Sequence, residues 1–375
     1  MLRLLHLADV HLGASMSSFG DAAEARRRSL LDAFRELPGI ARREDVHAVL
    51  IAGDLFDRPE PETEVRAAVA EAFARLAAEG RPVFVVPGNH DSSTLHHHPY
   101  TEPLGGARVF LCPTFERHSV ETAAGPLHVY GLAYDMGRED APLTTYARAD
   151  LPGRHVVLLH GSADFSPHWE IGRNALRLPL DAVARMDCDY LALGDYHGFR
   201  PPARFAGLAS PAACYPGSFA ALDLTETGPR GYVIVELDTQ GPPRVSHHAS
   251  SVPALQDLGD VDVGAAADHD EVVRRIGERV EPGAHPVARL VGVPDFALDV
   301  EFLTHRLSER FGFARLTDAS TFYPSARLDR IAAEDTVAGH TVRLARGRIE
   351  SEPDPDEKAI AERALRIALR ALEVT

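Results

Sequence analysis

Five short segments of the chain bring aspartate, asparagine and histidine together at close spacing. They are Asp9-Val10-His11, Gly53-Asp54-Leu55-Phe56-Asp57, Gly88-Asn89-His90-Asp91, His160-Gly161 and Gly194-Asp195-Tyr196-His197. Carboxylate and amide oxygens are hard ligands and imidazoles are borderline ones, a combination that suits divalent metal ions. Two ions roughly 3.5 to 4 Å apart need a bridging carboxylate and about seven protein ligands in all. These residue types therefore predict a two-metal site.

The chemistry expected of such a site is hydrolysis of a phosphoester. Two cations offset the repulsion between phosphodiester and hydroxide, activate a bridging water near neutral pH and stabilise the transition state. The sequence offers no G-x-S-x-G nucleophile motif, and none of its three cysteines, Cys112, Cys188 and Cys214, lies in a ligand segment. These cysteines are too scattered for a disulfide framework or a zinc site, so we expect them to be reduced.

Each of the five segments directly follows a short apolar run that is typical of a buried strand. These runs are Leu2 to Leu7, Val49 to Ala52, Val83 to Val86, Val156 to Leu159 and Tyr190 to Leu193. Helix-like stretches such as 22–36 and 63–78 alternate with them, which predicts an α/β sandwich. Ligands gather beyond the carboxyl ends of strands in such folds, so we expect the segments to meet there. One such segment alone would be an ordinary polar turn or cap, but five in order favour the metal interpretation.

The remainder of the chain predicts further elements. Residues 211–237 resemble two strands joined by a Gly-Pro turn that continue the sheet in antiparallel fashion. Residues from about 270 to 345 suggest a small α+β module with helices near 271–279 and 300–310. A final amphipathic helix follows, with its apolar residues at Ile360, Ala364, Ile367, Ala368 and Leu372. That helix either packs on its own module or presents its apolar face to a partner.

In order and residue type, the five segments resemble the calcineurin-like metallophosphoesterases over residues 1–237. GDLFD, YLALGDYH and PGSFAALDLTETG resemble the SbcD-type DNA double-strand-break repair exonucleases, in particular short bacterial homologues encoded with an SbcC-like ATPase. The resemblance implies an α/β fold, a calcineurin-like β-sandwich flanked by helices, with a small α+β capping domain and a C-terminal helix. The corresponding ranges are a nuclease core at 1–265, a capping domain at 266–349 and a terminal helix at 350–375.

The resemblance also implies a role for each matching residue. One ion would be held by Asp9, His11, Asp54 and His197, and the other by Asp54, Asn89, His160 and Asp195. His90 would contact the scissile phosphate and help protonate the leaving oxygen, with Asp91 orienting it. We expect Asp57 to orient a ligand.

One position departs from the family pattern. The family usually has G-H-x-H in the last motif, whereas this chain has Asp195 in place of the first histidine. A carboxylate there favours harder ions, so the expected cofactor is two Mn²⁺, with Mg²⁺ or another divalent ion as the alternative. Two outcomes stay open at this position, a second ion with altered preference or a weakened one.

Composition limits the partners that can be expected. The net charge of −16 over 375 residues argues against binding nucleic acid by bulk charge, so any DNA contact must be local. Four arginines follow the His160 and His197 segments and are candidates for phosphate contacts: Arg173, Arg177, Arg200 and Arg204. The alternative, which their loop positions favour, is that they are solvated. The single lysine, Lys358, lies outside any P-loop, so an ATPase would have to be a separate chain. No apolar run approaches the ~18 residues of a membrane span, which predicts a cytoplasmic protein without membrane contact.

We interpret the sequence as a manganese-dependent, SbcD-like DNA nuclease, exonuclease or endonuclease, that acts in DNA repair or end processing with an SbcC-like ATPase. A homodimer is compatible with the family. The first alternative is a phosphodiesterase or phosphatase acting on a small or protein-bound phosphate, since the same segments serve those reactions. The second is a non-catalytic metal-binding scaffold subunit, motivated by Asp195 and by the net charge.

Overall fold

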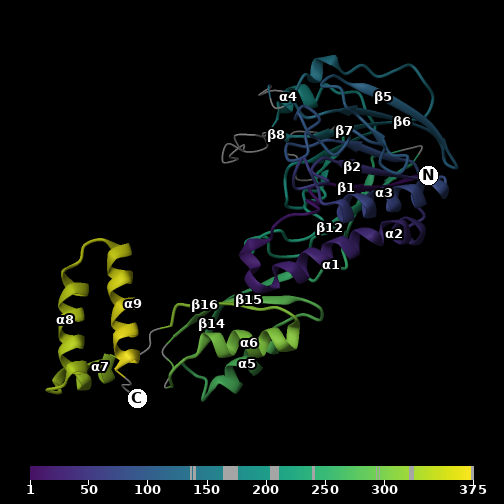
Figure 1. The fold of residues 1–375 in the computed structure, drawn as a ribbon. Coiled ribbons are helices and arrows are strands. Elements are labelled where there is room, and N and C mark those ends of the chain that lie inside the picture. The colour runs from purple at the N-terminus through teal and green to yellow at the C-terminus, as the bar shows by residue number, and fades with distance from the viewer. Residues whose placement is uncertain are drawn as a thin grey trace. The chain divides into compact units, whose positions relative to one another are not determined.

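The fold was analysed in a computed structural model that describes residues 1–135, 137, 141–163, 176–202, 211–238, 241–292, 294, 296–320 and 325–372. Contacts divide the chain into two units, Met1–Leu255 and Gln256–Thr375 (Figure 1). The division falls ten residues before the expected boundary at 265. Its physical reason is β14 (Leu255–Asp262), which pairs within the sheet of the second unit.

The first unit contains two β-sheets. One has the strand order β13 (Arg244–Ala249), β12 (Gly231–Leu237), β1 (Leu2–Leu7), β2 (Ala48–Ala52), β3 (Val83–Val86) and β4 (Arg108–Val109). The other has the order β11 (Ala213–Cys214), β10 (Tyr190–Gly194), β7 (Arg154–His160), β6 (Gly125–Leu132) and β5 (Glu116–Thr122). Strands β1 to β4 run parallel, as do β6, β7, β10 and β11.

The two sheets share one apolar core, and helices cover the first sheet (Figure 1). Leu4 and Leu50 of the first sheet lie in the same buried cluster as Val129, Val156 and Leu158 of the second. Each fully buried side chain of this kind stabilises the fold by roughly 1.5–3 kcal/mol. Strands buried on both faces have near-continuous apolar sequences, which is why the five runs were recognisable. The α/β sandwich with flanking helices is confirmed.

Helices and short elements complete the first unit. Helices α1 (Ala23–Arg35), α2 (Leu37–Arg43) and α3 (Thr63–Ala78) contact one another, and α3 contacts β3. Between α1 and α3, the ring centres of Phe34 and Phe73 lie 6.0 Å apart. The other elements are η1 (Ser17–Ala22), η2 (Leu143–Thr145), α4 (Leu180–Val183) and a two-stranded sheet of β8 (Ser162–Ala163) and β9 (Arg177–Leu178).

The prediction for residues 211–237 was partly wrong. Strand β12 does pair antiparallel with β1, as expected. Strand β11, however, pairs parallel with β10 and belongs to the other sheet. Residues 216–230 form the loop between the two sheets rather than a strand, and Gly217 there has a φ of +82°. Phe219, Ala220 and Ala221 of this loop are buried because the loop packs against the end of β1, where Ser218 pairs with Ala8. Their burial gives the loop a strand-like sequence.

The second unit begins with a small α+β module. Its sheet has the order β14, β15 (His285–Val291) and β16 (Arg315–Asp318), and α5 (His269–Gly277) and α6 (Val300–Phe311) contact each other. Asp268 and Asp299 cap the two helices by accepting hydrogen bonds from the backbone N–H groups of Glu271 and Phe302. Each such cap contributes about 1 kcal/mol.

Three helices follow, α7 (Ser325–Ala333), α8 (Val337–Ser351) and α9 (Pro355–Ala371). Leu365 and Leu369 of α9 are buried in one cluster with Val342 of α8. Ile360 and Ile367, which were expected on the apolar face, remain 60% and 61% exposed. Helix α9 thus packs against α8 through Leu365 and Leu369, each one position after a predicted residue, Ala364 and Ala368. In the described part of the chain, no helix has both the length and the apolar composition to cross a lipid bilayer.

Between the two sheets lies a buried histidine that cannot easily ionise. His6 on β1 is completely buried, and its Nδ1 lies 3.0 Å from the hydroxyl of Tyr190 on β10. Burial lowers the pKa of His6 to about 3. In the unfolded chain His6 has a pKa of 6.5, so between pH 6.5 and about pH 3 the unfolded chain binds a proton there that the folded chain does not bind. The free energy of unfolding therefore receives the full benefit of a neutral His6 above pH 6.5, and this benefit is lost as the pH falls below 6.5.

We expect His6→Asn to reduce the sensitivity of the fold to acid, because its amide can replace Nδ1 as the partner of Tyr190 without gaining a charge. Between pH 7 and pH 5 the native chain should lose about 2 kcal/mol more unfolding free energy than the variant. Urea unfolding in EDTA measures this difference. The control is His305→Asn, whose native side chain is 71% exposed. Equal pH slopes for native chain and His6→Asn would contradict the assignment.

Candidate metal centre

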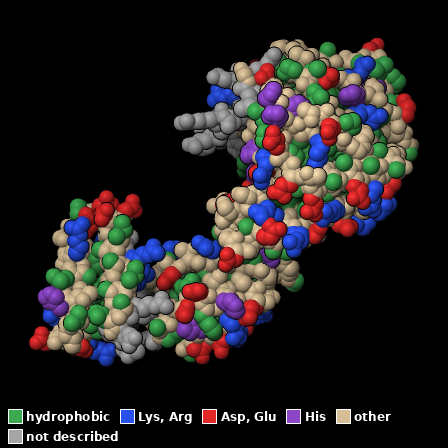
Figure 2. Space-filling view, in the orientation of Figure 1, with side chains coloured by type: hydrophobic (Ala, Val, Ile, Leu, Met, Phe, Trp, Pro, Cys, Tyr) green, Lys and Arg blue, Asp and Glu red, His purple; other side chains and the backbone are tan. Residues whose placement is uncertain are grey.

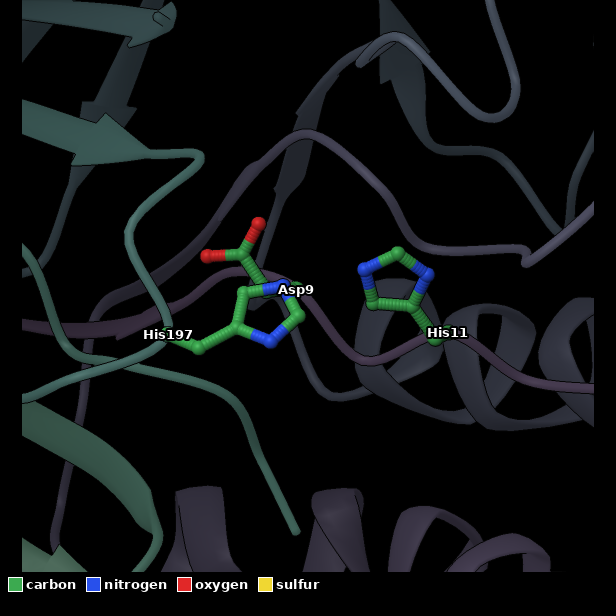
Figure 3. Close-up of side chains that lie close together, drawn as sticks. All are labelled: Asp9, His11 and His197. Carbon is green, nitrogen blue, oxygen red and sulfur yellow. The ribbon is translucent and has the colours of Figure 1, made fainter. Parts of the chain in front are cut away.

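The structure brings all seven predicted ligands to one end of the two sheets. Asp9, Asp54 and Asn89 follow the neighbouring parallel strands β1, β2 and β3, whereas His160 ends β7 and Asp195 follows β10. The carboxyl ends of parallel strands lie at one edge of each sheet, and the two edges face each other across the core. Figure 3 shows Asp9 and His11 on one loop, with His197 approaching from a different segment.

Asp54 lies at the centre of this group. Its Oδ2 is 3.4 Å from Nε2 of His11 and 3.5 Å from Nε2 of His160. Its Oδ1 accepts a hydrogen bond of 2.9 Å from the backbone N–H of His90. Burial alone would raise the pKa of Asp54, but the imidazoles of His160 and His11 hold it below its usual value. The carboxylate is thus ionised and faces an imidazole on either side, as a bridging ligand requires.

His160 is oriented by its backbone partner. Its Nδ1 donates to the carbonyl of Ala52 at 2.9 Å, which leaves Nε2 directed at Asn89 Oδ1, 2.9 Å away, and at Asp195 Oδ1, 3.7 Å away. Burial opposes protonation of the ring, but Asp54 and the neighbouring carboxylates raise the pKa of His160 to about 9. A cation bound among these carboxylates would take the place of that proton.

His11 and His197 have carboxylate partners on the nitrogen that faces away from the centre. Nδ1 of His11 lies 3.2 Å from Oδ1 of Asp57, and Nε2 of the same ring is buried without a hydrogen-bond partner in the described structure. Nδ1 of His197 bonds Oε1 of Glu226. Burial opposes protonation of His197, but Glu226 raises its pKa to about 9. Carboxylates behind metal-binding imidazoles commonly fix the tautomer that exposes the other nitrogen.

Asp9 and Asp195 lie against each other. The backbone N–H of Asp195 donates to both carboxylate oxygens of Asp9, at 3.0 and 3.2 Å. Burial raises the pKa of Asp9 and of Asp195. Negative charge here is costly until a cation compensates it. The carboxylates, together with Nε2 of His11, which faces Asp54 without a hydrogen bond, therefore fit divalent ions well.

Four of the seven predicted ligands adopt a strained backbone. Asp9, His11 and Asp54 have φ near +50°, and Asp195 has φ of +103°. Each such conformation costs a non-glycine residue on the order of 1 kcal/mol or more, and it persists only where the surroundings enforce it. Here the enforcing contacts include the hydrogen bonds from Asp9 N to Gly53 O and from His11 N to Asp54 O. Strain of this kind gathers at functional sites.

Two of the motif glycines make room for the ligand side chains themselves. A Cβ on Gly88 would lie 2.1 Å from Oδ1 of Asp54, and one on Gly53 would lie 2.2 Å from Nδ1 of His160. Glycine at these two positions therefore leaves the space that the Asp54 carboxylate and the His160 imidazole occupy.

The expected role of Asp91 was wrong. Its buried carboxylate accepts hydrogen bonds from the backbone N–H groups of Gly88 and Phe56 and from the hydroxyl of Tyr100. These three donors occupy it, so it stabilises the turn instead of orienting His90. The acceptor beside His90 is the carbonyl of Asp57, 3.0 Å from Nδ1. The His90 side chain is 44% exposed and forms the outer edge of the site.

The predicted substrate arginines are not gathered by the described structure. Arg173 and Arg204 lie outside the described residues. Arg177 is exposed on β9, and the guanidinium of Arg200 lies 4.9 Å from the ring centre of Tyr196.

Sequence reasoning missed Glu226. This residue lies 29 positions after His197, within the loop between β11 and β12, and its other oxygen accepts from Ser218 Oγ and from the backbone N–H of Leu222. No strand end precedes it, so its type and position gave no local signal. Only the folding of the loop under the strand ends brings it to the centre.

Comparisons with known proteins place the chain in a family. The sequence profile of the calcineurin-like phosphoesterases matches residues 2–199, more than half of the chain. The uncharacterised metallophosphoesterase YhaO of Bacillus subtilis is 27% identical over 63% of this chain and 57% of its own length. The DNA double-strand break repair protein Mre11 of Methanosarcina mazei is 28% identical over 64% of this chain and 37% of its own.

Mre11 of Halobacterium salinarum is 27% identical over 92% of both chains. The matches with YhaO and the Methanosarcina protein cover less than two thirds of those proteins. Among solved structures, TT1561 of Thermus thermophilus superposes with a TM-score of 0.37 at 15% identity, covering 66% of this chain and 98% of that one. The family is shown by the profile match over the segments that carry the site. The chain belongs to the calcineurin-like phosphoesterases, metallophosphoesterases that use divalent metal ions.

Proposed function

We propose that this protein is a two-metal-dependent DNA nuclease of the SbcD type that acts in DNA repair or end processing. The observation that carries the proposal is the buried carboxylate and imidazole cluster around Asp54, in which His11 and His160 direct Nε2 at the same carboxylate. The similarity to Mre11 proteins favours DNA over a small phosphoester as the substrate. With the Halobacterium protein, this similarity extends over 92% of the chain.

We assign one ion to Asp9, His11, Asp54 and His197, and the other to Asp54, Asn89, His160 and Asp195. When bound, the ions supply Lewis-acid charge for phosphodiester hydrolysis near neutral pH. Asp57 and Glu226 hold the imidazoles of His11 and His197 by their outer nitrogens. Because Asp195 adds a carboxylate where the family has histidine, we propose Mn²⁺ as the preferred ion, with Mg²⁺ second.

His90 is the residue that we propose to meet the substrate. The carbonyl of Asp57 accepts from its Nδ1, which directs Nε2 away from the protein. In the protonated ring, Nε2 can bond the scissile phosphate and donate a proton to the leaving oxygen. Its exposure allows this contact without rearrangement of the core.

DNA contact must be local, and a partner is expected to supply ATPase activity. On the face visible in Figure 2, acidic and basic side chains are interspersed over the described part of the first unit. We propose an SbcC-like ATPase as the partner. Its docking surface would be the exposed apolar side chains of α8 and α9, with Val337 70%, Leu344 64% and Ile367 61% exposed.

We expect Asp54→Asn to abolish binding of both ions, because the proposal assigns this one carboxylate to both sites. The amide oxygen of asparagine can still accept the hydrogen bond from the backbone N–H of His90, so the turn should be preserved. The matched control is Asp57→Asn, which should still bind two ions with affinity lowered about 10–100-fold, since Asp57 only orients His11. Mn²⁺ titration by calorimetry counts the ions. Two ions in Asp54→Asn, or none in Asp57→Asn, would refute the assignment of the bridge.

Glu226→Gln should weaken Mn²⁺ binding about 10–100-fold for one of the two ions. The reason is that a neutral amide no longer provides a negative charge next to Nδ1 of His197. Ser218→Ala serves as control: it removes a hydrogen bond from the same carboxylate and leaves the Glu226 to His197 bond in place. Two-site titration monitored by Mn²⁺ electron paramagnetic resonance separates the affinities. If Glu226→Gln binds both ions like the native chain, Glu226 does not position His197.

Cleavage of end-labelled linear DNA with Mn²⁺, Mg²⁺ or EDTA tests the function itself. We expect manganese-dependent cleavage that falls at least about 100-fold in His90→Ala, as for loss of a general acid. Truncation of this half-exposed side chain leaves the core intact. A native protein that hydrolyses bis(4-nitrophenyl) phosphate but leaves DNA uncut, with or without an SbcC-like ATPase, would instead indicate a small-substrate phosphodiesterase. A protein that binds two ions and cleaves neither substrate would be a scaffold.

A further inference from the structure

An exposed aromatic ring stands beside the metal centre and takes no part in holding ions. Phe199 follows His197 by two residues, and 39% of its surface is exposed. Two residues span at most about 7 Å of chain. A phosphate held at His197 would therefore place its own nucleotide, or the next one, within reach of this ring.

The backbone on both sides of Phe199 is held in place. The N–H of Ser218 donates to the carbonyl of His197 at 2.9 Å, and Arg200 and Tyr215 exchange backbone hydrogen bonds of 2.9 and 3.1 Å. Gly217 packs so closely that a Cβ there would lie 2.9 Å from the backbone N of Phe199. The ring therefore projects from a defined position beside the site.

A second ring supports Phe199 from behind. His247 of β13 lies with its ring centre 4.6 Å from that of Phe199, at an interplanar angle of 37°. His247 is opposite Val233 of β12, the strand next to β1, so it lies at the end of the sheet that carries Asp9. Close by in the chain, the Arg200 guanidinium lies over the Tyr196 ring in a cation–π contact. Paired rings of this kind form platforms on which bases stack.

We propose that Phe199, supported by His247, is a stacking surface for the nucleobase next to the scissile phosphate. This inference rests on the proposed nuclease function and names the part of the substrate that the site recognises beyond the phosphate. Every base has a flat aromatic face, so stacking would position a DNA end without selecting its sequence. Bound ions would hold the phosphate, and a stacked base would in addition orient the strand.

The test combines a protein variant with a substrate variant. Two single-stranded oligonucleotides differ only in an abasic tetrahydrofuran unit at the nucleotide next to the cleaved bond. We expect kcat/KM of the native protein to be roughly tenfold lower on the abasic strand. Phe199→Ala should lose a similar factor on the intact strand and lose nothing more on the abasic one, while Phe199→Trp restores the preference.

Leu151→Ala is the matched control. Leu151 is 41% exposed and precedes β7, at the end opposite His160, so its removal should change neither substrate. A native protein that cleaves both strands equally, or a Phe199→Ala variant that keeps the preference for the intact strand, overturns the stacking role and leaves the nuclease function standing.

Failure of the nuclease function gives a different result. The native protein would then hydrolyse bis(4-nitrophenyl) phosphate and cut neither oligonucleotide. Fluorescence of an oligonucleotide with 2-aminopurine at its end still tests stacking in that case. Quenching by the native protein that is lost in Phe199→Ala supports the platform, and unchanged fluorescence with native protein overturns it.

Discussion

The buried carboxylates at the strand ends are the constraint on which the rest of the site depends. Asp9 and Asp54 are buried, and Asp195 is nearly so, within one small volume. The positive charge that favours their ionisation comes chiefly from the imidazoles of His160 and His197 around Asp9, and of His160 and His11 around Asp54. Such a cluster is unfavourable on its own and becomes favourable around divalent cations, which accounts for its burial.

The sandwich of two sheets, each with a parallel centre, holds these side chains together. Strands β1, β2 and β3 supply one half of the cluster, and β7 and β10 supply the other, with one apolar core between them. Left-handed backbone at Asp9 and Asp54 turns each carboxylate back over the strand ends. The strain is sustained by contacts such as the hydrogen bond from Asp9 N to Gly53 O, and Gly88 leaves room for the Asp54 carboxylate.

The sequence predicted what depends on strands and on the residues directly after them. Continuous apolar runs indicated β1, β2, β3, β7 and β10, and the first Asp, Asn or His after each run is one of five predicted ligands. The other two predicted ligands, His11 and His197, lie two residues further along in the same segments. The loop at 216–230 was misread as a strand because burial, not sheet pairing, sets its apolar pattern. The contact of Glu226 with His197 could not be predicted, because it depends on how that loop folds.

Asp91 shows the same limit at shorter range. A carboxylate next to His90 in the sequence was expected to serve that histidine, yet three donors from elsewhere in the fold occupy it. In α9, helical periodicity indicated an apolar face, but contact with α8 selected Leu365 and Leu369 rather than Ile360 and Ile367. Partners that come from distant segments cannot be assigned from local pattern alone.

The central claim is that two ions share the Asp54 carboxylate, and anomalous diffraction at the manganese edge tests it most directly. Crystals of the native protein grown with Mn²⁺ should show two peaks, one on either side of Asp54, with one near His11 and His197 and the other near His160 and Asp195. The carboxylate and imidazole atoms of His11, Asp57 and His90 also lie within 4.8 Å of one another. A single peak among those three residues, or no peak within ligand distance of Asp54, would contradict the account.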